Sequence, residues 1–247
     1  MRRRIWSQCN ELPRLAVKRG SLTMPPIYKP TFGPEDWKQF LAKPDLHWKS
    51  GYSAKSMAYS WEESDGFPAE ISKAIFDVWG VQPEPLIIIP EYKVPLPGGN
   101  TDSQNDAFVL CRIGEQTAVV MIEGKVSEPF GPSVGEWFQN PSPGKVERLQ
   151  YLCSLLGLSY PPAPQLRYQL LHRCASAIIE AERYKADLAI MIVHSFSQEH
   201  VWFDDLSAFT AELGATSELG RLSRANSVSG RPFYLGWVTG SAVYLTR

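Results

Sequence analysis

The 247-residue chain has few cysteines, no long apolar run and no recognisable nucleotide-binding loop. Its four cysteines are scattered and form no Cys-x-x-Cys pair, which argues against a zinc finger and favours a reduced, cytoplasmic setting. No apolar run approaches the roughly eighteen residues that a membrane helix needs, so no membrane partner is expected. Neither a Gly-x-Gly-x-x-Gly fingerprint nor a Walker loop occurs, and this removes nucleotide-dependent functions.

The chain also lacks an excess of basic residues, which proteins that hold nucleic acid by its phosphates usually carry. Residues 1–23 contain six Lys or Arg and one acid, without the continuous apolar core of a secretion signal. We interpret them as a disordered basic tail, with Met24 as an alternative to Met1 for the true start. Residues 24–247 hold 19 bases against 25 acids, a formal charge of −6, and are expected to form one domain.

The most informative stretch, Val119–Val126, places Glu123 and Lys125 two residues apart at the end of an apolar run. Residues two apart in a β-strand share a face, so both charges point to the same side. Burying either charge without a partner costs on the order of several kcal/mol, so both need a reason to be there. A metal site would supply that reason.

A second acid, Asp106, opens another apolar strand that ends at Cys111. The short polar segment 112–117 predicts a hairpin connection to the strand that carries Glu123. Antiparallel pairing then brings the two acids together, because each lies at the end away from the turn. Converging carboxylates repel each other, and a divalent cation relieves that repulsion.

These residues resemble the motif of the PD-(D/E)xK nuclease superfamily, which has the restriction-endonuclease-like fold. In the resemblance, which covers about residues 69–195, Asp106 begins one strand and Glu123-Gly124-Lys125 ends the next. The sequence departs from the pattern at Asn105, where the family often has Pro, and at Gly124, where a bulkier residue is common.

The resemblance implies that Asp106, Glu123 and the Gly124 carbonyl hold Mg²⁺ or Mn²⁺. It further implies that Lys125 positions or deprotonates the attacking water and stabilises charge on the phosphate. The implied reaction is hydrolysis of a phosphodiester bond, with DNA favoured over RNA as the partner.

Two predicted helices supply further candidates through the same resemblance. Glu70 lies in the first turn of a helix predicted over 69–79, and the first core helix of the superfamily sometimes contributes an acid to the metal. Gln169 begins a helix predicted over 166–186, where relatives often carry a polar residue that orients water or phosphate. An acid in a first turn is also favoured by the helix dipole alone.

A second Glu-x-Lys spacing, Glu91-Tyr92-Lys93, competes with the first. It follows a predicted buried strand over 86–90, and Pro90 and Pro95 bracket it. This pattern predicts a strand that leaves the sheet into a loop, so we prefer the pair at positions 123 and 125.

The order of helix, three strands, helices and strand predicts an α/β domain with a mixed central sheet flanked by helices, hence a restriction-endonuclease-like core. Small helices over 34–41 and 54–61 form an N-terminal addition. Segments 233–238 and 242–245 predict a closing C-terminal hairpin, with Gly240-Ser241 near its turn.

Two other functions stay open. One is a catalytically inactive module of the same fold that binds a protein partner, which the negative charge and several aromatics expected at the surface favour: Trp37, Trp48, Trp137 and Trp202. The other is a hydrolase that uses His172 or His194, although no Gly-x-Ser-x-Gly elbow accompanies either.

Two expectations concern assembly and surface charge. A homodimer is one, because many enzymes that cut duplexes act as dimers. A local basic patch for nucleic acid is the other, and its candidates are Arg167, His172, Arg173, Arg183, Arg221, Arg224 and Arg231.

Overall fold

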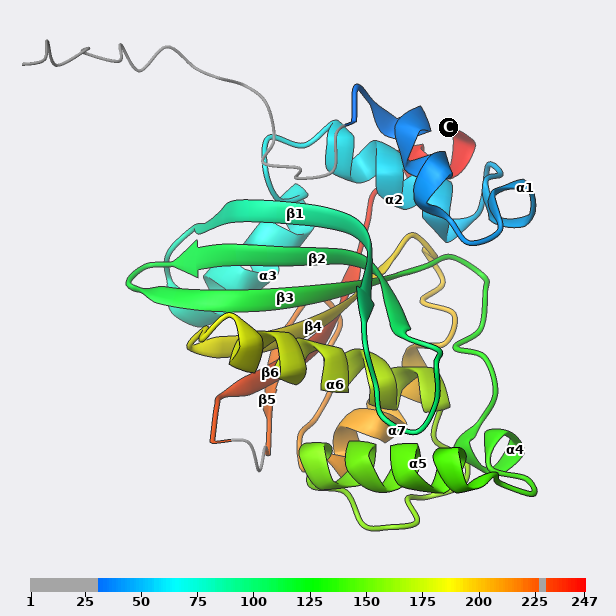
Figure 1. Ribbon diagram of the computed structural model, residues 1–247. Coiled ribbons are helices and arrows are strands. Elements are labelled where there is room, and N and C mark those ends of the chain that lie inside the picture. The colour runs from blue at the N-terminus through cyan, green and yellow to red at the C-terminus, as the bar shows by residue number, and fades with distance from the viewer. Residues whose placement is uncertain (1–30, 227–229) are drawn as a thin grey trace, which may run out of the picture.

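The computed structural model describes residues 31–226 and 230–247, and in this part of the chain a mixed six-stranded sheet carries helices on both faces (Figure 1). The strands are β1 (Pro83–Val94), β2 (Ser103–Ile113), β3 (Gln116–Lys125), β4 (Leu188–Ser195), β5 (Leu222–Ala225) and β6 (Phe233–Thr239). The α-helices are α1 (Pro44–His47), α2 (Ser53–Glu62), α3 (Ala69–Trp79), α4 (Val134–Trp137), α5 (Pro143–Leu156), α6 (Tyr168–Arg183) and α7 (Phe203–Glu212). Two 3-10 helices are η1 (Pro34–Phe40) and η2 (Ala242–Thr246).

The sheet order β1-β2-β3-β4-β6-β5 confirms the predicted α/β class with a mixed central sheet. Strands β1, β2 and β3 are antiparallel neighbours, whereas β3, β4 and β6 run parallel. The predicted hairpin of β2 and β3 is confirmed, with Ala107 opposite Ile122. Its turn contains Gly114 at φ 60°, a backbone conformation that glycine adopts without strain.

Side chains alternate along β3 between two buried cores. Val119 and Met121 belong to the core that α5, α6 and α7 cover, and Val120 and Ile122 belong to the core beneath α2 and α3. This period-two alternation continues to the end of the strand, so Glu123 shares the α6 face with Met121.

Strand β1 does not leave the sheet at Glu91, so that prediction was wrong. The strand continues to Val94 and keeps its pairing with β2, ending opposite Ser103. Glu91 has a φ of 51°, and beyond this irregular residue the β1–β2 ribbon bends and runs over α6 (Figure 1). Prolines are tolerated here because β1 is an edge strand.

Two terminal predictions need correction or fall outside the structure. The closing hairpin is wrong in its second half, because 242–246 form η2; strand β6 already has β4 and β5 on its two sides, which leaves no place for a returning strand. The predicted tail, residues 1–23, lies outside the described residues. Among the helices described, none is long and apolar enough to cross a membrane.

Candidate active site

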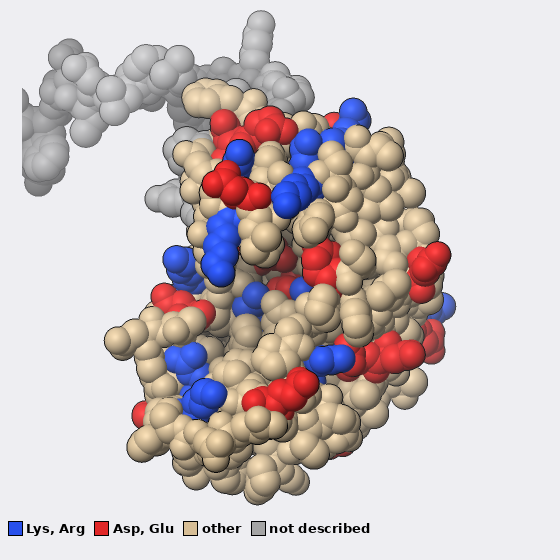
Figure 2. All heavy atoms as spheres, turned by 90° about the vertical axis from the view of Figure 1, so that its right-hand side faces the viewer, with Lys and Arg blue, Asp and Glu red and all other residues tan. Residues whose placement is uncertain are grey.

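An open cavity of about 590 Å³ lies where β3 ends, on the face of the molecule shown in Figure 2. Its walls come from four parts of the chain: the N-terminal helices, the bent β1–β2 ribbon, the loop of residues 128–132 and the first turns of α6. Figure 2 shows both acidic and basic groups at the bottom of this hollow. The cavity therefore collects charged side chains from elements that are distant in the sequence.

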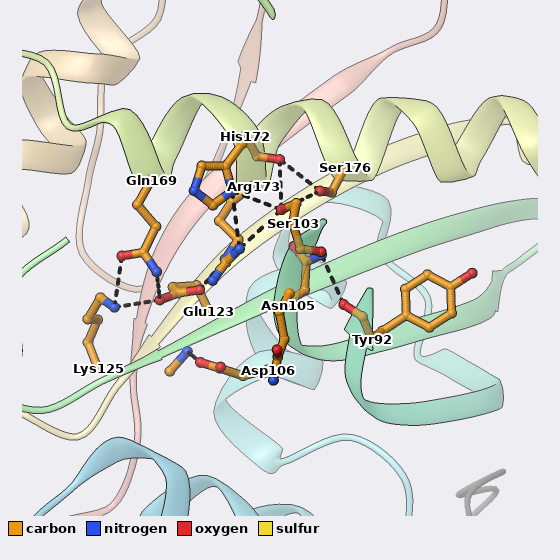
Figure 3. A network of polar contacts seen from close by, with 12 residues as sticks. Tyr92, Ser103, Asn105, Asp106, Glu123, Lys125, Gln169, His172, Arg173 and Ser176 are labelled. Carbon is orange, nitrogen blue, oxygen red and sulfur yellow. Dashed lines mark hydrogen bonds and ion pairs between the residues drawn. The ribbon is translucent and has the colours of Figure 1, made fainter. Parts of the chain in front are cut away.

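Five of the predicted site residues line this one cavity, and three different elements supply them: Asp106, Glu123, Gly124, Lys125 and Gln169. The hairpin pairing of β2 and β3 explains why the first four meet. Helix α6 packs on the face of the sheet that carries Glu123 and Lys125, so Gln169 in its first turn reaches these two side chains. Figure 3 shows Glu123, Lys125 and Gln169 pointing toward one another, whereas the Asp106 carboxyl points to the backbone N–H of Gly124.

The Glu123 carboxylate is held by three donors (Figure 3). Its Oε1 accepts from Lys125 Nζ at 2.5 Å and from Gln169 Nε2 at 2.8 Å, and its Oε2 accepts from Arg173 Nε. Burial opposes ionisation, but the charges and hydrogen bonds of Arg173 and Lys125 prevail and lower the pKa of the Glu123 carboxyl. Glu123 is therefore an anion whose partners are protein cations, and this accounts for both buried charges that the sequence left unexplained.

Asp106 has the opposite electrostatic balance. Its Oδ2 accepts the backbone N–H of Gly124 at 2.6 Å, which fixes the carboxyl beside the end of β3. Burial and then the neighbouring Glu123 and Glu91 carboxylates raise the pKa of Asp106 well above its ordinary value, and nearby cations offset only part of this effect. The nearby cations thus do not fully stabilise a negative charge at Asp106.

Lys125 and Gln169 complete the group around Glu123. Lys125 Nζ donates to Gln169 Oε1 at 3.3 Å and lies 4.9 Å from the centre of the Phe130 ring, a cation–π distance. The Gln169 amide thus donates to Glu123 and accepts from Lys125, so it fixes both at once. Its predicted role, to orient water or phosphate, stays a prediction.

Two residues of the site were not predicted as such. Arg173, expected in a surface patch, binds Glu123; its spacing of four from Gln169 puts both on one face of α6, and this signal was available. Glu91 also lines the cavity, because the pairs Pro90–Ala107 and Tyr92–Asn105 set it across from Asp106. The sequence could not reveal that neighbourhood without the register of β1.

His172 also lines the cavity and is held as a neutral donor. Its Nδ1 lies 3.2 Å from Arg173 Nη1, a group that only donates, and 2.8 Å from Ser103 Oγ. Nδ1 is then the acceptor and Nε2 carries the ring proton. Burial, followed by the charge of Arg173, lowers the pKa of His172 well below its ordinary value.

Glu70 does not join this group, contrary to its predicted role as a metal ligand. Its Oε1 lies 2.9 Å from Nε2 of His194, the β4 residue paired with Gly124. Both lie on the α3 face of the sheet, whereas Glu123 lies on the α6 face. The same contact occupies His194, and neither residue is among those that line the cavity.

The expected basic patch does not form as a free surface. Most of its arginines are paired with acids: Arg167 with Asp205, Arg173 with Glu123, Arg183 with Glu180, Arg221 with Glu218, and Arg231 with Glu182. Pairing removes most of the field that would attract a phosphate backbone.

A family model, described as a domain of unknown function, DUF6946, matches residues 30–242. The chain belongs to the DUF6946 family. The match spans the whole sheet and each residue of the cavity, so the site belongs to the DUF6946 domain itself. Searches of curated proteins and of solved structures give no significant match.

Proposed function

We propose that the DUF6946 domain is a metal-dependent phosphodiesterase that hydrolyses nucleic acid. The observation that carries the proposal is the convergence of Asp106, Glu123 and Lys125, with Gln169, in one cavity. The order α3-β1-β2-β3-α4-α5-α6-β4 supports it further, since a helix, three strands, helices and a further strand are the order expected of a restriction-endonuclease-like core. Membership in the PD-(D/E)xK superfamily is part of the same proposal.

The donor set fits Mg²⁺ in its chemistry. Asp106, Glu123 and the Gly124 carbonyl would hold the ion, which favours oxygen ligands and keeps several waters. Burial, and then the Glu123 and Glu91 carboxylates, raise the pKa of Asp106, and a divalent cation would offset the part that these two carboxylates contribute. Among the described residues no group of three or more His, Cys, Asp or Glu is placed to hold a metal, so a carbonyl and water must complete the set. When bound, such an ion polarises a phosphoryl oxygen and lowers the pKa of a water.

The chain's own groups then have distinct tasks. Lys125 would place its ammonium beside the attacked phosphate, where negative charge develops in the transition state. Gln169 would keep Lys125 and Glu123 in a fixed relation, since its amide contacts both. The neutral His172 would donate a hydrogen bond from its Nε2–H to a phosphate oxygen, which adds no charge to the site. Lys125 and His172 would thus contact the phosphodiester, and Gln169 would hold Lys125 in place.

A direct test uses the full chain with Mg²⁺ or Mn²⁺ and labelled single-stranded DNA, duplex DNA and RNA. Glu123→Ala and Asp106→Ala should each reduce cleavage by about 100-fold or more, as expected for loss of a metal ligand. Glu115→Gln is the matched control, because this fully exposed acid lies at the other end of the same hairpin. The proposal is wrong if the wild type cuts none of these substrates, or if Glu123→Ala cuts as fast.

An inactive module that binds a protein partner is the second candidate. The observation in its favour is the complete set of protein donors around Glu123, which stabilises the site without a metal. The aromatics expected at the surface support it less than the sequence suggested. Trp37 is buried and donates to Glu62, and the other three tryptophans are half-buried. The cleavage assay above separates the two candidates.

The setting and assembly also remain proposals. A reduced, cytoplasmic environment is supported by Cys111, Cys153 and Cys174, which are buried and form no disulfide. The preference for DNA over RNA rests on the resemblance alone, and so does the homodimer.

A further inference from the structure

Arg173 is a buried arginine at the centre of the polar network in Figure 3. Its Nε donates to Glu123 Oε2, and its Nη1 donates to Ser103 Oγ at 3.1 Å and lies 3.2 Å from His172 Nδ1. Ser103 is itself fixed by Ser176 Oγ at 2.9 Å. The guanidinium is therefore held in one orientation, from α6 across to the bent part of β2.

The same guanidinium has donors to spare. A guanidinium carries five N–H donors, and the contacts above use those of Nε and Nη1. Within the described part of the chain, Nη2 has no hydrogen-bond acceptor, although Arg173 lines the cavity. A planar fork with free N–H groups suits the oxygens of a phosphate.

Acidic side chains outnumber basic ones in the lining of the cavity, even with Arg173 present. Two formal cations, Lys125 and Arg173, face five carboxylates in the described lining: Glu91, Asp102, Asp106, Glu123 and Glu128. A carboxylate-rich pocket attracts a divalent cation and repels a phosphate. Each cation in the lining therefore has opposite effects on the two ligands that the proposed reaction needs.

We infer that Arg173 offsets part of the negative charge of the site: it weakens binding of the divalent cation and strengthens binding of the substrate phosphate. This inference rests on the proposed function and names the regulation of its metal. Arg173 shares Glu123 with the proposed metal position, so the guanidinium and the ion repel each other across one carboxylate. The same positive charge, with the Nη2 donors, attracts the phosphate group. Arg173 is thus a positioning residue for Glu123 and a contact for substrate.

Binding measurements on Arg173→Met test the inference without any cleavage. With Mn²⁺ alone as the probe, titrated by electron paramagnetic resonance, we expect affinity to rise about tenfold, as loss of one nearby charge at partial burial predicts. With inorganic phosphate as the probe, titrated calorimetrically at saturating Mg²⁺, we expect affinity to fall about tenfold, because a charge-assisted contact is lost. These two changes have opposite signs, which a general loosening of the site would not produce.

Two further variants identify the cause. Arg173→Lys keeps the charge and should leave Mn²⁺ affinity within about threefold of the wild type, since the electrostatic term is retained. Arg183→Met is the matched control, because Arg183 lies on the same helix but pairs with Glu180 outside the cavity, and it should change neither affinity. If Arg173→Met does not fold, as judged by circular dichroism, Arg173→Gln takes its place.

The outcomes separate this inference from the proposed function. Unchanged or weaker Mn²⁺ binding by Arg173→Met, or phosphate binding equal to that of the wild type, would overturn the role of Arg173 alone. A tenfold gain in Mn²⁺ affinity in Arg173→Lys would also overturn it, since charge would not be the cause. If neither the wild type nor any variant bound Mn²⁺, both the inference and the proposed metal-dependent function would be wrong.

Discussion

The Asp106 carboxylate accepts the backbone N–H of Gly124 at 2.6 Å, so the first acid of the site is fixed directly to the peptide bond between Glu123 and Gly124. This contact depends on the absence of a side chain at position 124. A Cβ there would lie 2.7 Å from Met57 Cγ and 3.1 Å from Asp106 Oδ2. The glycine that departs from the family pattern is thus matched to helix α2, which packs over it.

Gly124→Ala should lower the free energy of unfolding by about 1–3 kcal/mol, the usual range for overpacking a well-packed core. Met57 is the flexible neighbour, so the double variant with Met57→Ala should show a favourable coupling energy of about 1 kcal/mol in a double-mutant cycle. Urea denaturation of the wild type, the two single variants and the double variant measures this coupling energy. Strict additivity would mean that Met57 is not the group that excludes a side chain at position 124.

Lys125 and Lys93 provide a matched comparison of the two Glu-x-Lys spacings. Lys125 is buried against Glu123, whereas Lys93 is exposed on β1. Lys125→Met should reduce cleavage by about 100-fold, the effect of losing one transition-state contact, and Lys93→Met should leave it unchanged. Cleavage rates of the two variants, measured at saturating Mg²⁺, test this expectation. Equal losses in the two variants would restore the spacing at position 91 as a rival.

Asp106→Asn should separate stability from activity. The folded protein holds this carboxyl at a raised pKa, so ionised Asp106 destabilises the fold, and wild-type stability falls as pH rises above the ordinary aspartate value of 3.8. The amide oxygen of Asn can still accept the Gly124 N–H. The variant should therefore gain stability relative to the wild type as pH rises from 4 toward 7, while losing cleavage. Urea midpoints across this range test it, and a variant less stable at pH 7 than at pH 4, relative to the wild type, contradicts it.

His172 should make the fold sensitive to mild acid. Its pKa is depressed in the folded state, so below its ordinary value of 6.5 the unfolded chain binds a proton that the folded chain does not. That contribution to stability is full above this pH and is lost as pH falls below it. Between pH 7 and 5, the thermal midpoint should thus drop less in His172→Gln than in the wild type. Parallel slopes for the two proteins would show that His172 titrates normally.

Glu70→Gln tests the correction made for the predicted metal ligand. The amide oxygen can still accept from His194 Nε2, and the residue lies on the other face of the sheet from Glu123. Mn²⁺ affinity and cleavage should both remain at the wild-type level. Calorimetric titration measures the Mn²⁺ affinity. Glu123→Gln serves as the comparison, and it should lose Mn²⁺ binding. A loss in Glu70→Gln as large as in that variant would place Glu70 at the metal after all.

Local patterns in the sequence determined the hairpin and the shared face of Glu123 and Lys125. An apolar alternation of period two, a polar turn with Gly114 and acids at the open ends were sufficient, because β-pairing of adjacent strands depends on nearby residues. The same locality made α3 and α6 predictable. It also placed Asp106, Glu123 and Lys125 together, and Gln169 on the right helix.

Only the tertiary structure decided which charges neutralise one another. Arg173 lies 50 residues from Glu123, and Glu70 lies 124 residues from His194, so no local pattern links either pair. The register of edge strand β1 brought Glu91 beside Asp106, and the two-sided pairing of β6 excluded the expected closing strand. Electrostatic partners are chosen by packing across the sheet, and packing depends on every element at once, which is why the sequence identified the acids but not what holds them.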